Sequence, residues 1–167
     1  YGLGLDAVAP ALHSAGCRDF FTASLDEGIA LRRRLSECRI YVIFGPTPED
    51  AVEFLRHGLV PVLNHLGQIE TWRAQSHGQN HPGKAEKALL HIDTGMSRLG
   101  LPADELARLA AEPERLHGID IAYCMSHLAC AEQPDHEMNA RQLAEFEAAL
   151  KALAASAPTG GGSLANS

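Results

Sequence analysis

Residues 40–63 read IYVIFGPTPEDAVEFLRHGLVPVL, and this stretch sets the pattern from which the fold follows. Two continuously apolar runs, residues 40–44 and 59–63, flank a short amphipathic segment. Within that segment Thr47 is a favoured helix N-cap residue and Pro48 suits the first helical position, which predicts a helix that begins at Pro48. Continuously apolar strands are typical of parallel sheets that are covered by helices. The stretch therefore predicts a strand–helix–strand unit.

The apolar runs recur along the whole chain. They are rich in valine, isoleucine, phenylalanine and tyrosine, and short runs of this kind are typical of buried strands. Besides the two above, strands are predicted at residues 20–23, 88–92 and 119–125, and a weaker one at residues 163–165.

Helix signals lie between these runs. Ser24 and Glu27 have the spacing of a capping box, and Pro102 opens a helical segment over residues 103–111. Asp135 precedes a long helix predicted over residues 138–155. Its apolar face is expected to consist of Leu143, Phe146, Leu150 and Leu153.

Strict alternation of strands and helices indicates an α/β protein with a parallel sheet. A doubly wound sheet would usually carry a glycine-rich turn after its first strand, and no GxGxxG string follows a predicted strand here. The (β/α)8 TIM barrel fits better, because about 250 residues make eight units and 167 residues hold five or six. We therefore expect an incomplete barrel of about six strands, in which residues 1–167 are a fragment of a longer protein.

Composition and charge narrow the class of partner. Hydrophobic residues make up 46% and charged residues 21% of the chain, as in ordinary globular domains. With 14 basic against 21 acidic residues the formal charge is -7, which offers a nucleic acid no attractive field. The basic run at residues 32–34 reads as a solvated helix end. No apolar stretch could cross a bilayer and no basic signal-peptide region is visible, so a cytoplasmic protein without nucleic-acid or membrane partners is expected.

The cysteines allow one metal hypothesis. Cys124, His127, Cys130 and His136 form a C-x2-H-x2-C-x5-H string, whose soft ligands have zinc-like spacing and would suit an interaction module. However, Cys124 closes a predicted strand, and a strand turns successive side chains to opposite faces. A protein without a metal site is therefore the preferred interpretation, and zinc stays an alternative.

Polar residues gather where the predicted strands end. The string DTGMSRLG at residues 93–100 follows one strand, Ser126-His127 follows the next, and Asn166-Ser167 follows the last. In (β/α)8 barrels the loops at the carboxyl ends of the strands build the active site. A guanidinium, an imidazole and hydroxyl groups at one rim suit an anionic ligand.

Four strings in this chain resemble motifs of the fold-type III alanine racemases. They are YGLG at residues 1–4, HIDTGMSRLG at 91–100, MSHLACAEQPDHEMNARQL at 125–143 and SLANS at 163–167. The resemblance implies a pyridoxal 5′-phosphate (PLP) barrel domain of a homodimeric enzyme that interconverts L- and D-alanine by a two-base mechanism. Such enzymes supply D-alanine for peptidoglycan. A racemase of another amino acid and a non-catalytic PLP-binding barrel of cofactor homeostasis remain alternatives.

The resemblance also assigns roles to residues. The PLP-bearing lysine would lie on a first strand before Tyr1, and the last barrel unit and a β-rich C-terminal domain, whose tyrosine is the second base, would follow residue 167. No catalytic residue is then expected within the chain, and the fragment alone should be inactive. The residues present would have binding roles. Arg98 would bind the PLP phenolic oxygen and the substrate carboxylate, and His127 would join the hydrogen-bond network behind the cofactor. The phosphate would be bound by Tyr1, Asn166 and Ser167.

One position departs from the family pattern. Many members carry a carbamylated lysine where this chain has His91, and the carbamate's negative charge positions the arginine seven residues on, here Arg98. An imidazole cannot supply that charge. We expect another acid, a bound anion or simple hydrogen bonding to orient Arg98, and we expect Asp93 to organise the loop by hydrogen bonds.

Overall fold

The structure is a computed structural model that describes residues 4–76, 85–154 and 161–164. The chain divides into two compact units, Tyr1–Val62 and Leu63–Ser167, and each is described by itself. Within the described ranges, no helix combines the length and the hydropathy that crossing a membrane requires.

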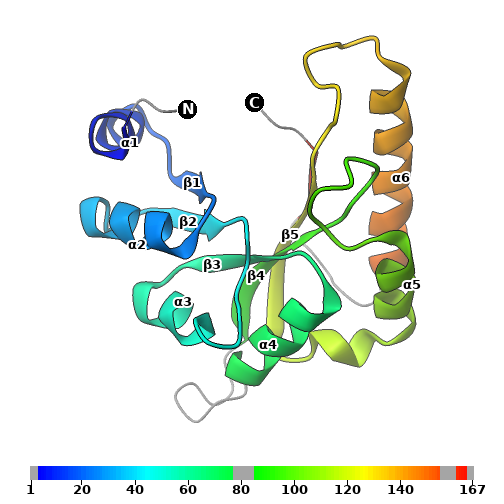
Figure 1. The fold of residues 1–167 in the computed structure, drawn as a ribbon, viewed down its shortest axis with the longest axis horizontal. Coiled ribbons are helices and arrows are strands. Elements are labelled where there is room, and N and C mark those ends of the chain that lie inside the picture. Colours follow the sequence, from blue (N-terminus) through cyan, green and yellow to red (C-terminus); the bar gives the residue numbers. More distant parts are fainter. Residues whose placement is uncertain (1–3, 77–84, 155–160, 165–167) are drawn as a thin grey trace. The chain divides into compact units, whose positions relative to one another are not determined.

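The first unit alternates helices and parallel strands (Figure 1). Strand β2 pairs in parallel with β1 on one side and with β3 on the other, so that Asp19 lies opposite Arg39 and Tyr41 opposite Val60. The predicted strands are confirmed to within three residues at each end. In chain order the elements are α1 (Leu5–Ser14), β1 (Asp19–Thr22), α2 (Leu25–Arg34), β2 (Arg39–Val42), α3 (Ala51–His57) and β3 (Val60–Leu63), which reaches the boundary of the unit.

Both ends of α2 are held by side chains. At its start the predicted capping box is confirmed: the Ser24 side chain accepts from the Glu27 N–H, and the Glu27 carboxylate accepts from the Ser24 N–H. At its end Arg32 donates to main-chain carbonyls on two following segments, including those of Cys38 and Gly58. This arginine closes the helix end through hydrogen bonds, whereas a solvated helix end was expected.

The predicted start of α3 is wrong. The helix begins at Ala51 after a turn, and its N-cap residue is Asp50, whereas Thr47 and Pro48 were expected to cap and open it. Asp50 and Ala51 both donate main-chain hydrogen bonds to the Thr47 carbonyl, and the Asp50 carboxylate accepts from the Thr47 N–H at 2.7 Å. The Thr-Pro signal therefore produced a separate turn, which the aspartate closes.

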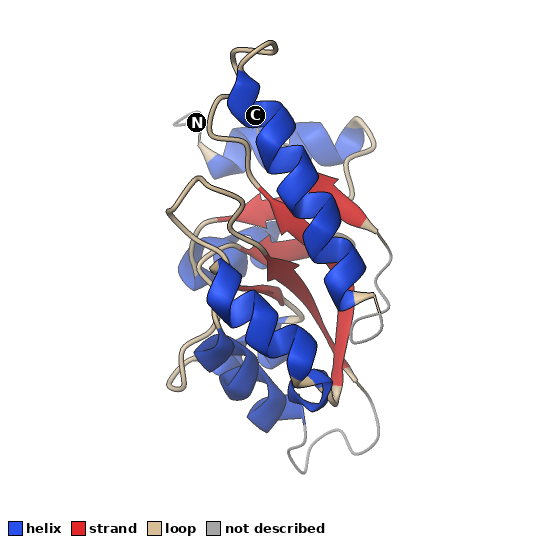
Figure 2. Ribbon diagram, turned by 90° about the vertical axis from the view of Figure 1, so that its right-hand side faces the viewer, coloured by secondary structure: helices blue, strands red, loops and turns tan. Residues whose placement is uncertain are grey.

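The second unit contains three further parallel strands. Strand β5 pairs with β4 and with β6, while α5 packs beside α6 and α6 contacts β6 (Figure 1). Figure 2 looks onto these two helices, which lie in front of the strands. The elements are α4 (Leu66–Ser76), β4 (Glu86–His91), α5 (Ala103–Ala111), the 3-10 helix η1 (Pro113–Leu116), β5 (Ile119–Ser126), α6 (Glu137–Leu153) and β6 (Gly162–Leu164).

A bulge shifts the register between β4 and β5. Ala88 pairs with Ile121 but Leu89 pairs with Tyr123, so Ala122 is the extra residue. Beyond the bulge, His91 lies opposite Met125 at the carboxyl ends of the two strands. A bulge reorients the side chains that follow it. It therefore decides which residues of β5 accompany His91.

The predicted buried face of α6 is partly wrong. Phe146 and Leu153 are buried as expected, but Leu143 is 47% exposed and the neighbouring Gln142 is fully buried. The helix thus turns a polar side chain inward at a position where the apolar pattern favoured leucine. The partners of Gln142, described below, explain this choice.

The capping box predicts a measurable loss of stability. Ser24→Ala leaves the Glu27 N–H without its side-chain acceptor, and we expect the free energy of unfolding to fall by about 1 kcal/mol. Urea denaturation of the protein measures the change. Ser36→Ala, at an exposed position after the same helix, is the control and should leave stability unaltered. Equal values for the two variants would contradict the role assigned to the cap.

Candidate functional site

The second unit carries buried polar side chains at positions where strands end. His91 ends β4, Ser126 ends β5, and Asn64 directly follows β3. These three side chains are each no more than 4% exposed. Polar groups buried at strand ends need partners or a ligand, so this edge is the candidate site.

A closed loop follows β4. Ile92 and Leu101 form an isolated bridge, with Leu101 donating to the His91 carbonyl at 2.8 Å. Inside the loop the Asp93 carboxylate accepts from the N–H groups of Gly95 and Ser97, which confirms Asp93 as the loop organiser. A side chain at Gly100 would place its Cβ 2.7 Å from the Asp93 nitrogen, so glycine is required there.

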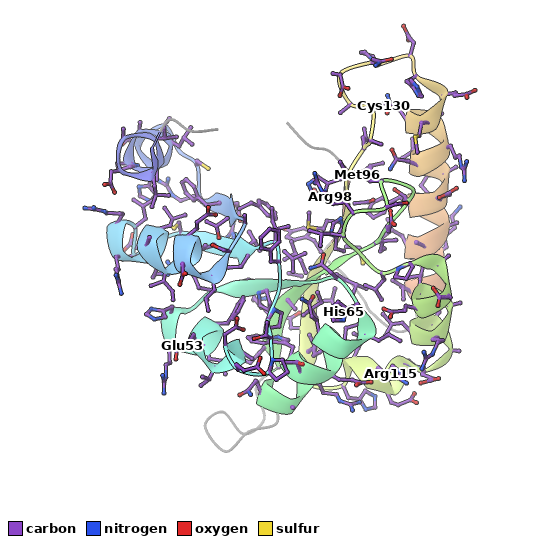
Figure 3. The ribbon with its side chains drawn as sticks, in the orientation of Figure 1. Glu53, His65, Met96, Arg98, Arg115 and Cys130 are labelled. Carbon is purple, nitrogen blue, oxygen red and sulfur yellow. The ribbon has the colours of Figure 1, made fainter. Side chains whose placement is uncertain are left out.

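Arg98 lies on this loop with an exposed side chain (Figure 3). In the described part of the chain it makes no ion pair, and Asp93, the only acidic side chain of the loop, accepts hydrogen bonds from main-chain N–H groups. A guanidinium without an ion-pair partner on a hydrogen-bonded loop is suited to hold an anion.

His91 is held from behind by two amides. Its Nδ1 lies 2.8 Å from Asn64 Oδ1, and the Asn64 amide donates in turn to Gln68 Oε1 at 3.3 Å. Gln68 belongs to the first turn of α4. Burial, together with the nearby charges of His127 and Arg98, lowers the His91 pKa to about 4 despite the opposing charge of Asp93. At neutral pH His91 is therefore an uncharged imidazole.

His127 lies next to His91. The two ring centroids are 5.2 Å apart, and partial burial and the charge of Arg98 lower the His127 pKa below its ordinary value. Its buried Nδ1 has no hydrogen-bond partner among the residues that the structure describes. An unpartnered buried nitrogen at this edge is a candidate ligand contact.

Gln142 from α6 ties the strand ends together. Its Nε2 donates to the His127 carbonyl at 2.8 Å and to Thr94 Oγ1 at 3.1 Å, and its Oε1 accepts from the Ala129 N–H at 2.8 Å. Thr94 and Ser126 share a further hydrogen bond at 2.8 Å. Sequence reasoning missed Gln142 as well as Asn64 and Gln68. The only signal for Gln142 was its place near the end of the motif at residues 125–143.

The structure gives the residues of the zinc hypothesis separate roles. Cys124 is fully buried in β5, which raises its pKa to about 12, and His136 Nδ1 caps α6 by accepting from the Met138 N–H. In residues 4–76, 85–154 and 161–164 no three histidine, cysteine or acidic residues gather as metal ligands would. Of the other expected cofactor contacts, Tyr1, Asn166 and Ser167 lie outside the described residues.

Comparison with known proteins identifies the family. The model of the family described as "Alanine racemase, N-terminal domain" matches residues 1–167. The chain belongs to the alanine racemase family. The resemblance of the four sequence strings is thereby confirmed.

Relatives place the chain within that family. It is 48% identical over 154 residues to the catabolic alanine racemase of Agrobacterium fabrum, covering 92% of this chain and 39% of the relative. The alanine racemase of Brucella abortus is 47% identical over 154 residues, covering 92% of this chain and 38% of that relative. This chain therefore spans about two-fifths of the length of the curated relatives it matches.

A solved structure confirms the fold class. The alanine racemase of Bartonella henselae, described with covalently bound pyridoxal phosphate, superposes with a TM-score of 0.90 at 37% identity, covering 100% of this chain and 47% of that one. The six parallel strands and their helices are thus part of a (β/α)8 barrel, as the alternation in the sequence predicted.

Gln142 should be a large contributor to stability. Gln142→Ala removes partners from the partly buried Ala129 N–H and the His127 carbonyl, and we expect a loss of about 2–4 kcal/mol in the free energy of unfolding. Leu143→Ala, at the exposed neighbouring position, should cost less than about 1 kcal/mol. Urea denaturation of both variants checks the difference. A larger loss of stability for Leu143→Ala than for Gln142→Ala would contradict this burial and would support the apolar face with Leu143 that the sequence predicted.

The depressed pKa of His91 makes stability depend on pH. Below pH 6.5 the unfolded imidazole takes up a proton that the folded one resists until about pH 4, so stability falls as the pH decreases through this window. The loss specific to His91 should approach roughly 3 kcal/mol. Urea denaturation of the wild-type protein and of His91→Gln, measured from pH 7 to pH 4, isolates this contribution. The free energy of unfolding of the variant should fall by roughly 3 kcal/mol less than that of the wild type. Parallel curves would refute a neutral His91.

Proposed function

We propose that this chain forms most of the PLP-binding barrel of an alanine racemase, which interconverts L- and D-alanine within a longer protein. The observation that carries the proposal is the Arg98 guanidinium, which makes no ion pair among the described residues and is held on a closed loop near His91 and His127, whose pKa values are both lowered. Relatives of this chain are named alanine racemase, and the Bartonella henselae enzyme is described with covalently bound pyridoxal phosphate.

The residues present fit an anionic cofactor. Arg98 supplies the positive charge, and the buried His127 Nδ1, without a partner in the described residues, supplies a polar atom at the same edge. When bound, PLP provides a conjugated ring that delocalises the charge left by removal of the alanine Cα proton. Arg98 would hold the phenolic oxygen and lie near the substrate carboxylate, and His127 would join the network behind the cofactor. Tyr1, Asn166 and Ser167 would bind the phosphate.

The two proton-transfer groups are proposed to come from outside residues 1–167. Among the lysines that the structure describes, Lys87 pairs with Asp120 at 2.7 Å near the amino end of β4, and Lys151 lies in the last turn of α6. Neither lysine lies at the carboxyl end of a strand, where the loop with Arg98 begins. A lysine preceding Tyr1 would hold the cofactor, and a tyrosine of the partner's C-terminal β-rich domain would face it.

The proposed assembly and cellular role are supported by family membership. We propose a cytoplasmic homodimer whose D-alanine enters peptidoglycan of the cell wall. The support is family membership together with relatives at 47–48% identity that are named alanine racemases. Size-exclusion chromatography with light scattering on the full-length protein tests the dimer, and a monomer that is active would contradict it.

The function is tested at Arg98. In the full-length protein Arg98→Ala should reduce racemisation by roughly 10²-fold or more, because a fixed charge partner of the reacting anions is lost. A coupled D-alanine assay measures the rate, and serine and lysine offered as substrates test the range. Arg141→Ala is the control, since Arg141 forms only an exposed ion pair with Glu145. No racemisation of alanine by the wild-type protein would refute the function, and unaltered turnover in Arg98→Ala would refute the role of this arginine.

A further inference from the structure

The side-chain amide of Gln142 has a fixed orientation. Its Oε1 accepts from the Ala129 main-chain N–H at 2.8 Å, and because a main-chain N–H only donates, this contact identifies the oxygen of the amide. The NH2 group therefore faces the other way, where it donates to the His127 carbonyl at 2.8 Å and to Thr94 Oγ1 at 3.1 Å. Gln142 is fully buried, so solvent does not compete for these hydrogen bonds.

The three partners of this amide belong to two separate segments. Thr94 lies in the closed loop at residues 92–101, here called the β4 loop, which also carries Arg98. His127 and Ala129 lie beyond the last residue of β5, in what is here called the β5 segment. One side chain of α6 thus bonds to both segments, although it belongs to neither.

Two further contacts strengthen this link. Thr94 Oγ1 also shares a hydrogen bond with Ser126 Oγ at 2.8 Å, and both residues are at most 2% exposed. Met138 of α6 lies against the β4 loop, because a Cβ added at Gly95 would come within 3.3 Å of Met138 Cε. Met138 and Gln142 are four residues apart and share one helix face. Helix α6 therefore contacts the β4 loop at two neighbouring positions.

The Thr94 hydroxyl is the contact on which the link depends. Without it, one buried N–H of the Gln142 amide loses its acceptor, and a buried donor without a partner is destabilising. We expect the amide to turn towards another acceptor. Since the same amide holds the Ala129 N–H and the His127 carbonyl, this movement also disturbs the β5 segment.

We propose that Gln142 and Thr94 are positioning residues that make the β4 loop and the β5 segment move as one unit. The coupling itself follows from the described hydrogen bonds. Its consequence for catalysis rests on the proposed function, in which Arg98 and His127 serve the same cofactor and must keep a fixed separation. Misplacement of such groups by about 1 Å lowers a rate by up to roughly 10²-fold.

The coupling is tested by hydrogen–deuterium exchange of the full-length protein, followed by mass spectrometry on a peptide that contains Ala129 and none of the β4 loop. Thr94→Val keeps the branched shape and removes the hydroxyl, and we expect the Ala129 amide to exchange about tenfold faster in this variant. Thr94→Ser retains the hydroxyl and should keep the exchange rate of the wild type.

Thr22→Val is the matched control for the exchange experiment. It removes another buried threonine hydroxyl, which hydrogen-bonds to the carbonyls of Ser24 and Tyr41 in the first unit, and it should leave Ala129 unaltered. Unaltered exchange at Ala129 in Thr94→Val would overturn the proposal. Equal acceleration in Thr94→Val and Thr22→Val would overturn it as well, because the effect would then be a general loss of stability.

Racemisation by the full-length protein tests the same coupling in the assembled site. Thr94→Val should lower kcat about tenfold and Gln142→Met at least as much, and adding Thr94→Val to Gln142→Met should cause no further loss, because one hydrogen bond joins the two residues. Thr94→Ser should keep kcat near that of the wild type. A double variant whose loss is the product of the single losses would contradict the coupling. A wild-type protein that does not racemise alanine would refute the proposed function, and the exchange experiment would still decide the coupling.

Discussion

Buried polar groups at the carboxyl ends of the strands need hydrogen-bond partners, and two glutamines supply partners for several of them. Gln68 in the first turn of α4 and Gln142 on α6 each accept from a main-chain N–H and bind a second polar side chain. A buried polar group without a partner costs about 1–3 kcal/mol. The helices therefore do more than cover the sheet, because each places one amide where the strands end.

These amides determine the electrostatics of the site. Gln68 holds Asn64, whose Oδ1 lies 2.8 Å from His91 Nδ1, and Gln142 holds the carbonyl of His127. With both histidines disfavoured as cations and Asp93 occupied by its own loop, Arg98 remains the dominant positive charge. A single exposed guanidinium beside neutral rings can bind an anion without competition from a neighbouring carboxylate.

The first unit uses its polar residues differently. Asp19 and Arg39, opposite each other at the amino ends of β1 and β2, form a two-point ion pair that lowers the Asp19 pKa, and Tyr41 also donates to Asp19. Arg32 closes the end of α2 on main-chain carbonyls. In barrels the amino ends of strands contribute to stability, and the carboxyl ends to function. The described contacts follow that division.

The sequence by itself determined the features that depend on neighbouring residues. The apolar runs, the capping box of Ser24 and Glu27, the helix over residues 103–111 and the loop organised by Asp93 involve contacts within a few positions, so their signals are local. The motif at residues 91–100 also identified Arg98 and the family.

Tertiary structure decided the rest. Apolar spacing could not tell that α6 would bury Gln142 and expose Leu143, because a glutamine is stable inside only when Thr94, His127 and Ala129 supply its partners. Likewise, His91 contacts Asn64, 27 residues away, and a hydrogen bond across that separation leaves no trace in local sequence.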